Sequence, residues 1–165
     1  MIKNTQCSPV NLLEKVRIGT PFDLEDARKI ALMLVDPDSK GDWNNCNLSH
    51  WQKCCYVLFI GVILHVAYAE PDKTLHGVAA YVENITDTNV AFEKMMQVEH
   101  DPDGKYGWKE EQGKPVKVHP VIIQAANDMY YKAEDSTSNL VILGNARSFV
   151  KPYLNPADQP ECCVP

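Results

Sequence analysis

The pattern of hydrophobic and polar positions predicts one helix, Trp51–Ala69, that is apolar on nearly every side. A helix without a polar face must be covered by other parts of the protein or by lipid. Its unbroken apolar run, Tyr56–Ala69, is 14 residues long and includes His65, whereas a bilayer requires about 20 apolar residues. We therefore expect a buried core helix with Trp51 in the core, and no segment that spans a membrane. Gly61 lowers helix stability by about 1 kcal/mol relative to alanine, which indicates that another helix crosses there at close range.

Shorter apolar stripes at helical spacing predict an all-α fold of about six helices packed around Trp51–Ala69. The stripes comprise Leu24, Ala27, Ile30, Ala31 and Leu34; Leu75, Val78, Ala79 and Val82; Phe92, Met95 and Met96; Ile122, Ala125, Ala126, Met129, Tyr130 and Ala133; and Leu140, Leu143, Ala146 and Val150. The residues expected at helix starts are Asp23, Thr74, Pro120 and either Asp135 or Ser136.

The segment His100–Lys117 is expected to be a long loop, because it holds three glycines and two prolines within 18 residues. A loop of this length is usually functional or disordered. The full chain of 165 residues has the size of one domain with a sizeable core. We expect that domain at residues 9–156, with flexible ends at 1–8 and 157–165.

The negative charge is concentrated in one quarter of the chain. The net charge is −6, and the window Glu70–Glu111 contains ten acidic and four basic residues, while the remainder is balanced at 12 of each. Charge runs are most often solvated surfaces. Binding along a phosphate backbone requires the opposite sign, so the composition argues against a nucleic-acid groove.

The sequence contains none of the common catalytic or nucleotide-binding motifs. It has no GxxxxGK[ST], GxSxG, HExxH or CxxC pattern. We therefore expect that the chain is not itself an enzyme and holds no cofactor. Its start does not resemble a signal peptide, and Cys54 and Cys55 are neighbours that point in different directions on the core helix. Free thiols in a reducing compartment are expected.

One group of potential ligands leaves a metal site open as an alternative. Cys46, His50 and Cys54 are each four positions apart and would share one face if the helix began at Cys46. No fourth ligand is evident, and the stretch Asn44–Leu48 forms helices poorly. His65 is interpreted as a core histidine hydrogen-bonded to a backbone carbonyl rather than as a ligand or base.

Three stretches of the sequence together resemble a known family. They are Asn11–Asp38 (NLLEKVRIGTPFDLEDARKIALMLVDPD), His50–Tyr81 (HWQKCCYVLFIGVILHVAYAEPDKTLHGVAAY) and Val118–Pro156, which begins VHP. They are similar to the all-alpha domain of the coupling-protein ATPases of type IV secretion and conjugation systems, the TraG-like family. The sequence departs from the family at Ser39, where glycine is usual, and at Asp42–Leu48, which resembles an insertion.

The resemblance implies a role in recognising substrates. In that family the domain is inserted into a RecA-like, membrane-anchored hexameric ATPase and lies at the cytoplasmic end of the ring, at the bacterial inner membrane. It implies a receptor for secreted effector proteins, or for the relaxase bound to transferred DNA, with the nucleotide motifs in the other domain. It implies no direct membrane contact. An inserted domain also implies chain ends that lie close together, here near Pro9 and Pro156.

A candidate partner surface follows from the charge and the resemblance together. Secretion signals recognised by this family are often basic, as the resemblance implies, and an acidic patch would speed their association. We expect the contacts to come from Asp101, Asp103, Tyr106, Trp108, Glu110 and Glu111. The alternatives are a DNA-contacting helical domain and a small zinc-stapled domain that uses Cys46, His50 and Cys54.

Overall fold

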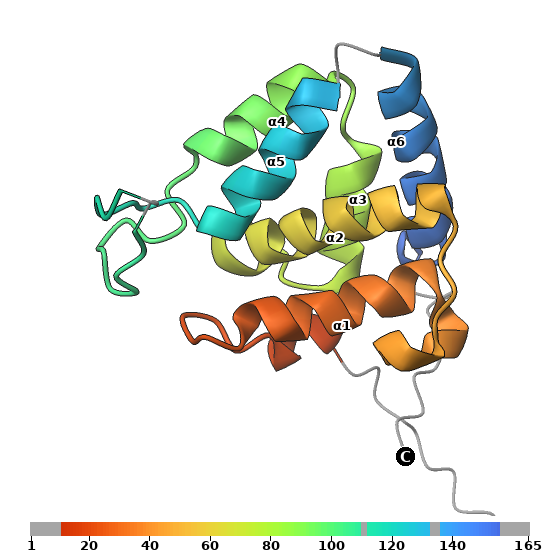
Figure 1. The fold of residues 1–165 in the computed structure, drawn as a ribbon, viewed down its shortest axis with the longest axis horizontal. Coiled ribbons are helices and arrows are strands. Elements are labelled where there is room, and N and C mark those ends of the chain that lie inside the picture. Colours follow the sequence, from red (N-terminus) through yellow and green to blue (C-terminus); the bar gives the residue numbers. More distant parts are fainter. Residues whose placement is uncertain (1–10, 110–111, 133–135, 156–165) are drawn as a thin grey trace, which may run out of the picture.

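The all-α prediction is confirmed by a computed structural model, which describes residues 11–109, 112–132 and 136–155. The described chain forms six α-helices and four short 3-10 helices and contains no strand (Figure 1). The α-helices are α1 (Asp23–Val35), α2 (His50–Ala69), α3 (Leu75–Glu83), α4 (Thr88–Gln97), α5 (Pro120–Lys132) and α6 (Ser136–Val150). The 3-10 helices are η1 (Leu12–Lys15), η2 (Pro37–Ser39), η3 (Trp43–Asn45) and η4 (Lys151–Tyr153).

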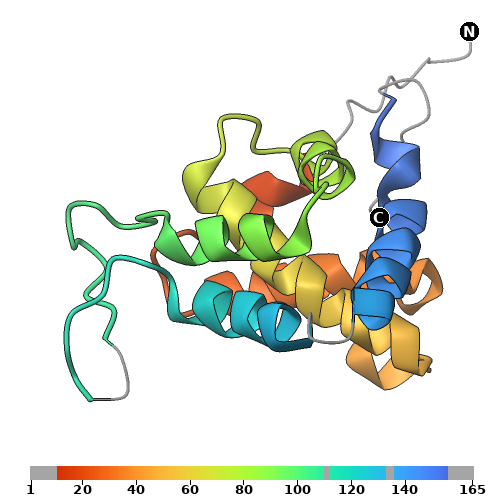
Figure 2. The same cartoon turned by 90° about the horizontal axis from the view of Figure 1, so that it is seen from above.

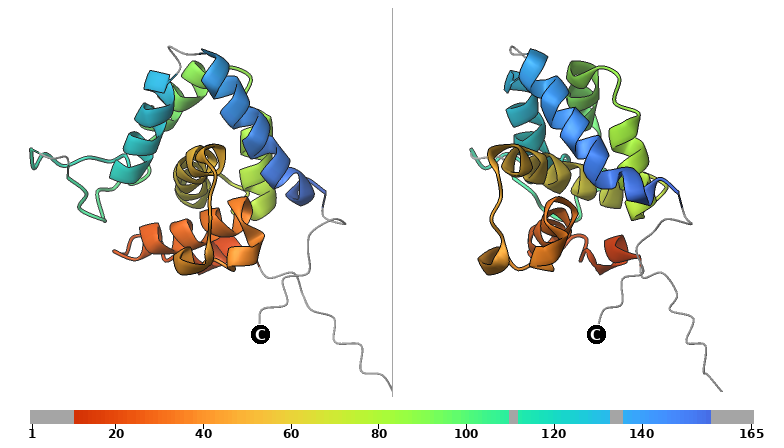
Figure 3. Two further views of the ribbon diagram at one scale, coloured as in Figure 1. Left: turned by 45° about the vertical axis from the view of Figure 1, so that its right-hand side comes forward. Right: turned by 90° about the vertical axis from the view of Figure 1, so that its right-hand side faces the viewer.

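Helix α2 is the predicted central helix, and α1, α3, α5 and α6 pack around it (Figure 3). It begins with a capping box, in which Ser49 accepts from the backbone of Gln52 and the Gln52 side chain accepts from Ser49. At its other end the Lys73 ammonium donates to the carbonyl of Ala67 at 2.7 Å, which satisfies one free carbonyl of the last turn. Trp51 is 38% exposed, so its expected place in the core is wrong: it lies in the first turn, before the helix enters the core.

By length and composition alone, α2 could also cross a membrane, contrary to the sequence-based expectation. However, 61% of its most apolar window is buried inside the described fold, and Leu58, Phe59 and Ile63 are fully enclosed. A core helix has this pattern because other helices, rather than lipid, cover its apolar surface.

The expected close crossing at Gly61 is confirmed, and the crossing helix is α5. A β-carbon built on Gly61 would lie 2.7 Å from the β-carbon of Ala125, closer than two such atoms can approach. The hydrogen atom of glycine therefore sets the distance between α2 and α5. The lower helix propensity of glycine is offset by the closer packing that it permits.

Three local predictions are wrong. Tyr130, expected on the buried face of α5, is 39% exposed. Leu140 is 70% exposed, whereas the rest of its predicted stripe on α6, Leu143, Ala146 and Val150, is buried together with Asn139 and Ile142. The buried Asn139 amide donates to the carbonyl of Met129, a partner that an apolar pattern does not reveal. Asp23 does not cap α1: Phe22 holds the N-cap position without a side-chain hydrogen bond, and the Asp23 carboxylate has other partners.

The remaining helix starts agree with the sequence wherever the structure describes them. Thr74 accepts from the backbone of Gly77 at the start of α3, and α5 begins at Pro120. Helices α4 and α5 pack along each other, and the loop that joins them extends from one end of the molecule (Figures 1 and 2).

Several sequence-based predictions fall on residues outside the described ranges. They concern Pro9 and Pro156, the ends 1–8 and 157–165, Ala133 and the alternative cap Asp135. The proximity of Pro9 and Pro156 therefore stays a prediction. The first and last described elements, η1 and η4, lie on the same side of the molecule (Figure 3, right).

Candidate partner-binding surface

The loop between α4 and α5 is folded around Asp101. Its carboxylate accepts hydrogen bonds from the backbone N–H groups of Lys105 and Tyr106, at 2.8 and 2.7 Å. The N–H groups of His100 and Asp101 both donate to the carbonyl of Lys117, which closes the base of the loop. Asp101 is only 2% exposed, so its expected place on a partner surface is wrong. Its charge is directed inward because it satisfies backbone donors that would otherwise be unpaired.

The two aromatic residues of this loop pack onto α2. The rings of Tyr106 and Trp108 lie 5.8 and 5.3 Å from the ring of Tyr68, and Trp108 also lies 4.6 Å from the imidazole of His119. Trp108 is therefore half-buried, while Tyr106 remains 38% exposed. Asp103 is exposed and paired with a neighbouring lysine. Glu110 and Glu111 lie outside the described residues.

Beneath these rings, Asp23 joins three parts of the chain. The Tyr68 hydroxyl donates to the Asp23 carboxylate at 2.5 Å, and the same carboxylate oxygen lies 3.1 Å from Nε2 of His119. The Tyr68 oxygen in turn accepts from the backbone N–H of Gly19 at 2.7 Å. Burial alone would raise the pKa of Asp23, but the hydrogen bonds from His119 and Tyr68 hold that pKa below its usual value.

A row of buried imidazoles continues from this point to the surface. The backbone N–H of His119 faces Nδ1 of His100 at 3.4 Å, Nε2 of His100 lies 2.9 Å from Nδ1 of His65, and Nε2 of His65 lies 3.3 Å from Glu70. His65 is buried as predicted, but its partners are His100 and Glu70, so the expected backbone carbonyl is wrong.

The hydrogen bonds of this row fit one set of neutral tautomers. Because Nδ1 of His100 accepts a hydrogen bond from the His119 backbone, the ring proton of His100 is on Nε2, which donates to Nδ1 of His65. The proton of His65 is then on Nε2, which donates to Glu70. Burial lowers the pKa of His100 to about 3, with the charges of His65 and His119 acting in the same direction. Burial also lowers the pKa of His65, against the opposing effect of Glu70. Both imidazoles are therefore neutral at pH 7.

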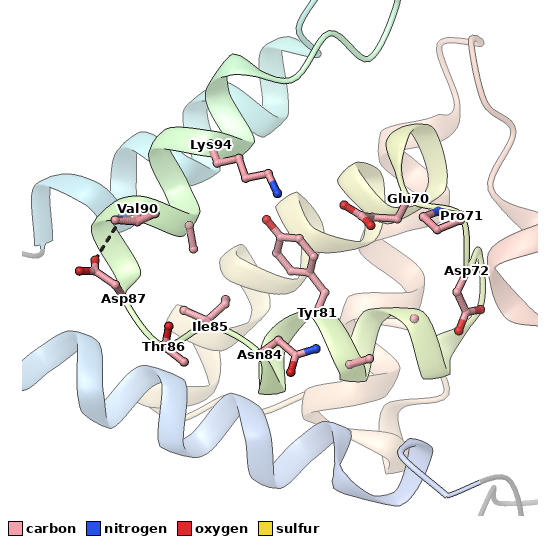
Figure 4. Close-up of a pocket in the computed structure, with 13 residues that line it drawn as sticks. Glu70, Pro71, Asp72, Tyr81, Asn84, Ile85, Thr86, Asp87, Val90 and Lys94 are labelled. Atoms are coloured by element: carbon pink, nitrogen blue, oxygen red, sulfur yellow. Dashed lines mark hydrogen bonds between the residues drawn. The ribbon is translucent and has the colours of Figure 1, made fainter.

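Glu70, at the end of this row, also lines a groove between α3 and α4 (Figure 4). The groove has a volume of about 430 Å³. Its carboxylates belong to Glu70, Asp72 and Asp87, and Lys94 supplies an ammonium group. Its apolar lining comes from Pro71, Ala80, Tyr81, Ile85, Val90 and Ala91. Every lining residue lies within the acidic window Glu70–Glu111, but none belongs to the loop that the sequence favoured.

The cysteines of the alternative metal site do not converge. The Cys46 thiol donates to the carbonyl of Trp43 at 3.1 Å, while Cys54 lies 3.8 Å from Nε2 of His50. Within the described residues, no group of three or more histidine, cysteine, aspartate or glutamate side chains is placed to hold a metal ion. The geometry thus gives no support to a zinc-stapled domain.

Comparison with known proteins identifies relatives of this chain by sequence. The chain is 30% identical over 148 residues to one conjugal transfer protein TraG of Escherichia coli, and 33% identical over 152 residues to a second protein of that name and organism. Each alignment covers 88% of this chain but only 21% of the relative. No protein-family model and no solved structure matches the chain. The predicted resemblance to TraG proteins is thereby confirmed, and the similarity extends over about a fifth of the length of these conjugation proteins.

Proposed function

We propose that this chain acts in conjugative transfer as the substrate-receptor domain of a coupling protein. The observation that carries the proposal is the similarity to two conjugal transfer proteins over 88% of the chain. The chain spans about a fifth of those proteins and lacks nucleotide-binding motifs, which suits a recognition domain rather than a motor. Its substrates would be secreted effector proteins or the relaxase of a transferred DNA.

The proposed setting follows from the same relationship. The domain would belong to a membrane-anchored ATPase of the cell envelope, at the cytoplasmic face of the inner membrane. Its other partners would be the remaining domains of that ATPase and components of the secretion channel. The acidic excess in Glu70–Glu111 favours a protein partner over DNA, because a bound duplex repels carboxylates.

The direct test is binding of the purified full chain to purified relaxase or effector protein from the same conjugation system, measured by calorimetry. Saturable binding that persists after nuclease treatment is expected. Absence of binding to every substrate protein of that system would refute the receptor role. Salt-sensitive binding to duplex DNA alone, with no protein partner, would favour the DNA-contacting alternative.

The loop between α4 and α5 provides a contact surface that can be tested within this role. Asp103 and Tyr106 are its exposed candidates, Trp108 is half-buried, and Glu110 and Glu111 complete the proposed set. Changing Glu110 and Glu111 to lysine should weaken substrate binding at low salt and less at high salt, where charges are screened. Tyr106→Ala should weaken it at both salt concentrations.

A further inference from the structure

We propose that the groove between α3 and α4 binds an extended cationic segment of a partner protein, with an apolar side chain of that segment seated against Tyr81 and Val90. This inference rests on the proposed receptor function and identifies where and how the partner docks. It differs from the loop surface, because the groove offers a concave site with both polar and apolar walls.

The charge of the groove fits a cation. Its lining carries three carboxylates and one ammonium, so the site is negative at neutral pH. The side chains of Glu70 and Asp72 remain 36% and 47% exposed, and both can accept further hydrogen bonds from a guanidinium or ammonium group. The third carboxylate, Asp87, already accepts from the N–H groups of Asn89 and Val90 at the start of α4. Asp72 likewise accepts from Thr74 and His76, and Glu70 faces His65, so each carboxylate would bind a cation through its remaining lone pairs.

The apolar part of the groove adds a second kind of contact. Val90 lies in the first turn of α4 and is 62% exposed. The ring of Tyr81 lies across the groove, and its inner side packs on the imidazole of His65 at 5.0 Å. A rigid, half-buried ring provides contact area with little loss of conformational freedom. An apolar side chain of a partner would cover both residues.

Lys94 is the one groove residue that opposes this ligand. In Figure 4 its side chain extends from α4 toward Tyr81. A bound cation would have to lie away from the Lys94 ammonium group. The same arrangement disfavours a nucleic-acid strand, whose phosphates could pair with Lys94 alone among the lining side chains. It also disfavours a bound metal ion, because the described residues contain no cluster of three suitable ligands.

The experiment uses the full chain and short synthetic peptides that carry arginine and leucine side chains. Titration of the ¹⁵N-labelled protein should shift the backbone resonances of α3 and α4, and binding should weaken as salt is added. A peptide with glutamate in place of each arginine should not bind. Resonance shifts confined to other helices, or no shifts at all, would overturn the proposal.

Pairs of variants, one inside and one outside the groove, test which residues contact the peptide. Lys94→Glu should strengthen peptide binding by roughly two- to fivefold, the range expected for one exposed charge pair. Lys114→Glu makes the same charge change outside the groove and should have little effect. Equal strengthening by both variants would indicate a general charge effect and would contradict a groove site.

Two further pairs of variants test the Glu70 carboxylate and the apolar wall of the groove. Glu70→Gln should weaken binding. Glu93→Gln removes a carboxylate of α4 that lies outside the groove and should not weaken it. Val90→Ser should weaken binding at all salt concentrations, whereas Val141→Ser on α6 should not. Circular dichroism of each variant checks that the fold is retained.

Failure of this inference is distinct from failure of the receptor role. If the chain binds its relaxase or effector protein but all groove variants bind it like the wild type, the groove is not the docking site and the receptor role stands. If the peptides bind in the groove but no substrate protein binds, the receptor role fails and the cation site stands.

Discussion

Nδ1 of His65 lies 2.9 Å from Nε2 of His100, and both imidazoles are buried. One nitrogen must donate and the other must accept, so the pair can form only while at least one ring is neutral. A second proton would place two like charges side by side in the core, without water to separate them. This contact makes the stability of the domain dependent on pH.

We expect the free energy of unfolding to fall as the pH decreases from about 6.5. The folded-state pKa of His100 is lowered to about 3, so between these values the unfolded chain takes up a proton that the folded chain excludes. The loss approaches about 1.4 kcal/mol per pH unit for such a histidine. Asp23, whose folded-state pKa is also lowered, adds a loss in the same direction at still lower pH.

Urea denaturation at pH 7 and pH 5 measures this effect. His100→Gln should reduce the dependence on pH, although it also weakens the fold. His50→Gln serves as the control, because the side chain of His50 is exposed. An identical midpoint at the two pH values for the wild-type protein would contradict the prediction.

Gly61→Ala should destabilise the protein by about 1–3 kcal/mol, despite the higher helix propensity of alanine, because the added methyl group collides with Ala125. The double variant with Ala125→Gly should recover part of the loss, since it removes the atom that collides. Gly144→Ala on α6 is the control: no atom lies within 4 Å of the added β-carbon, so that variant should be slightly more stable than the wild type. Chemical denaturation of the four proteins tests the crossing.

Leu58→Ala should lower the free energy of unfolding by about 2–5 kcal/mol, the usual range for a large-to-small change in a core. Leu58 is 2% exposed on α2, whereas Leu140 is 70% exposed on α6. Leu140→Ala should therefore alter stability by less than about 0.5 kcal/mol. Similar melting temperatures for the two variants would show that α2 is not the centre of the core.

Asp101→Ala should loosen the loop between α4 and α5, because the N–H groups of Lys105 and Tyr106 lose their acceptor. Faster cleavage of the loop by a protease and a change in the fluorescence of Trp108 are expected. Asp103→Ala removes an exposed carboxylate from the same loop and should change neither measurement.

The isolated chain should neither bind nor hydrolyse ATP, since its sequence offers no phosphate-cradling glycine loop. Calorimetry with ATP and magnesium, together with a phosphate-release assay, tests this expectation. A control preparation of an unrelated protein, purified in the same way, accounts for contaminating ATPase. Turnover above that control would show a nucleotide site that the sequence motifs do not reveal.

The helices could be predicted from the sequence because their signals are local. A capping residue, a proline at the first turn and apolar spacing lie within a few positions of one another, as at Thr74 and Pro120. The close approach at Gly61 could also be predicted, since a glycine inside a buried helix lowers helix stability and is usually explained by close packing. Only Leu140 of the α6 stripe was misplaced, because apolar spacing does not show that the neighbouring Asn139 amide is buried and donates to Met129.

The polar row could not be predicted, because it depends on contacts between distant segments. Asp23 and His119 are 96 positions apart, and neither is part of a motif. The lining residues of the groove all lie within residues 70–94, but their spacing in the sequence does not show that they surround a concave site. The count of charged residues did identify the acidic window. Within that window we chose the loop as the partner surface because its glycines, prolines and aromatic residues could be recognised from the sequence.

The hydrogen bond between Asp23 and His119 also limits where the chain can be shortened. A fragment that ends before α5 would remove the His119 partner of the Asp23 carboxylate and would uncover the face of α2 on which Ala125 rests. Loss of α1 would likewise leave His119 without its acceptor. The first and fifth helices therefore belong to one cooperative unit, and the domain is expected to fold only when both are present in the same chain.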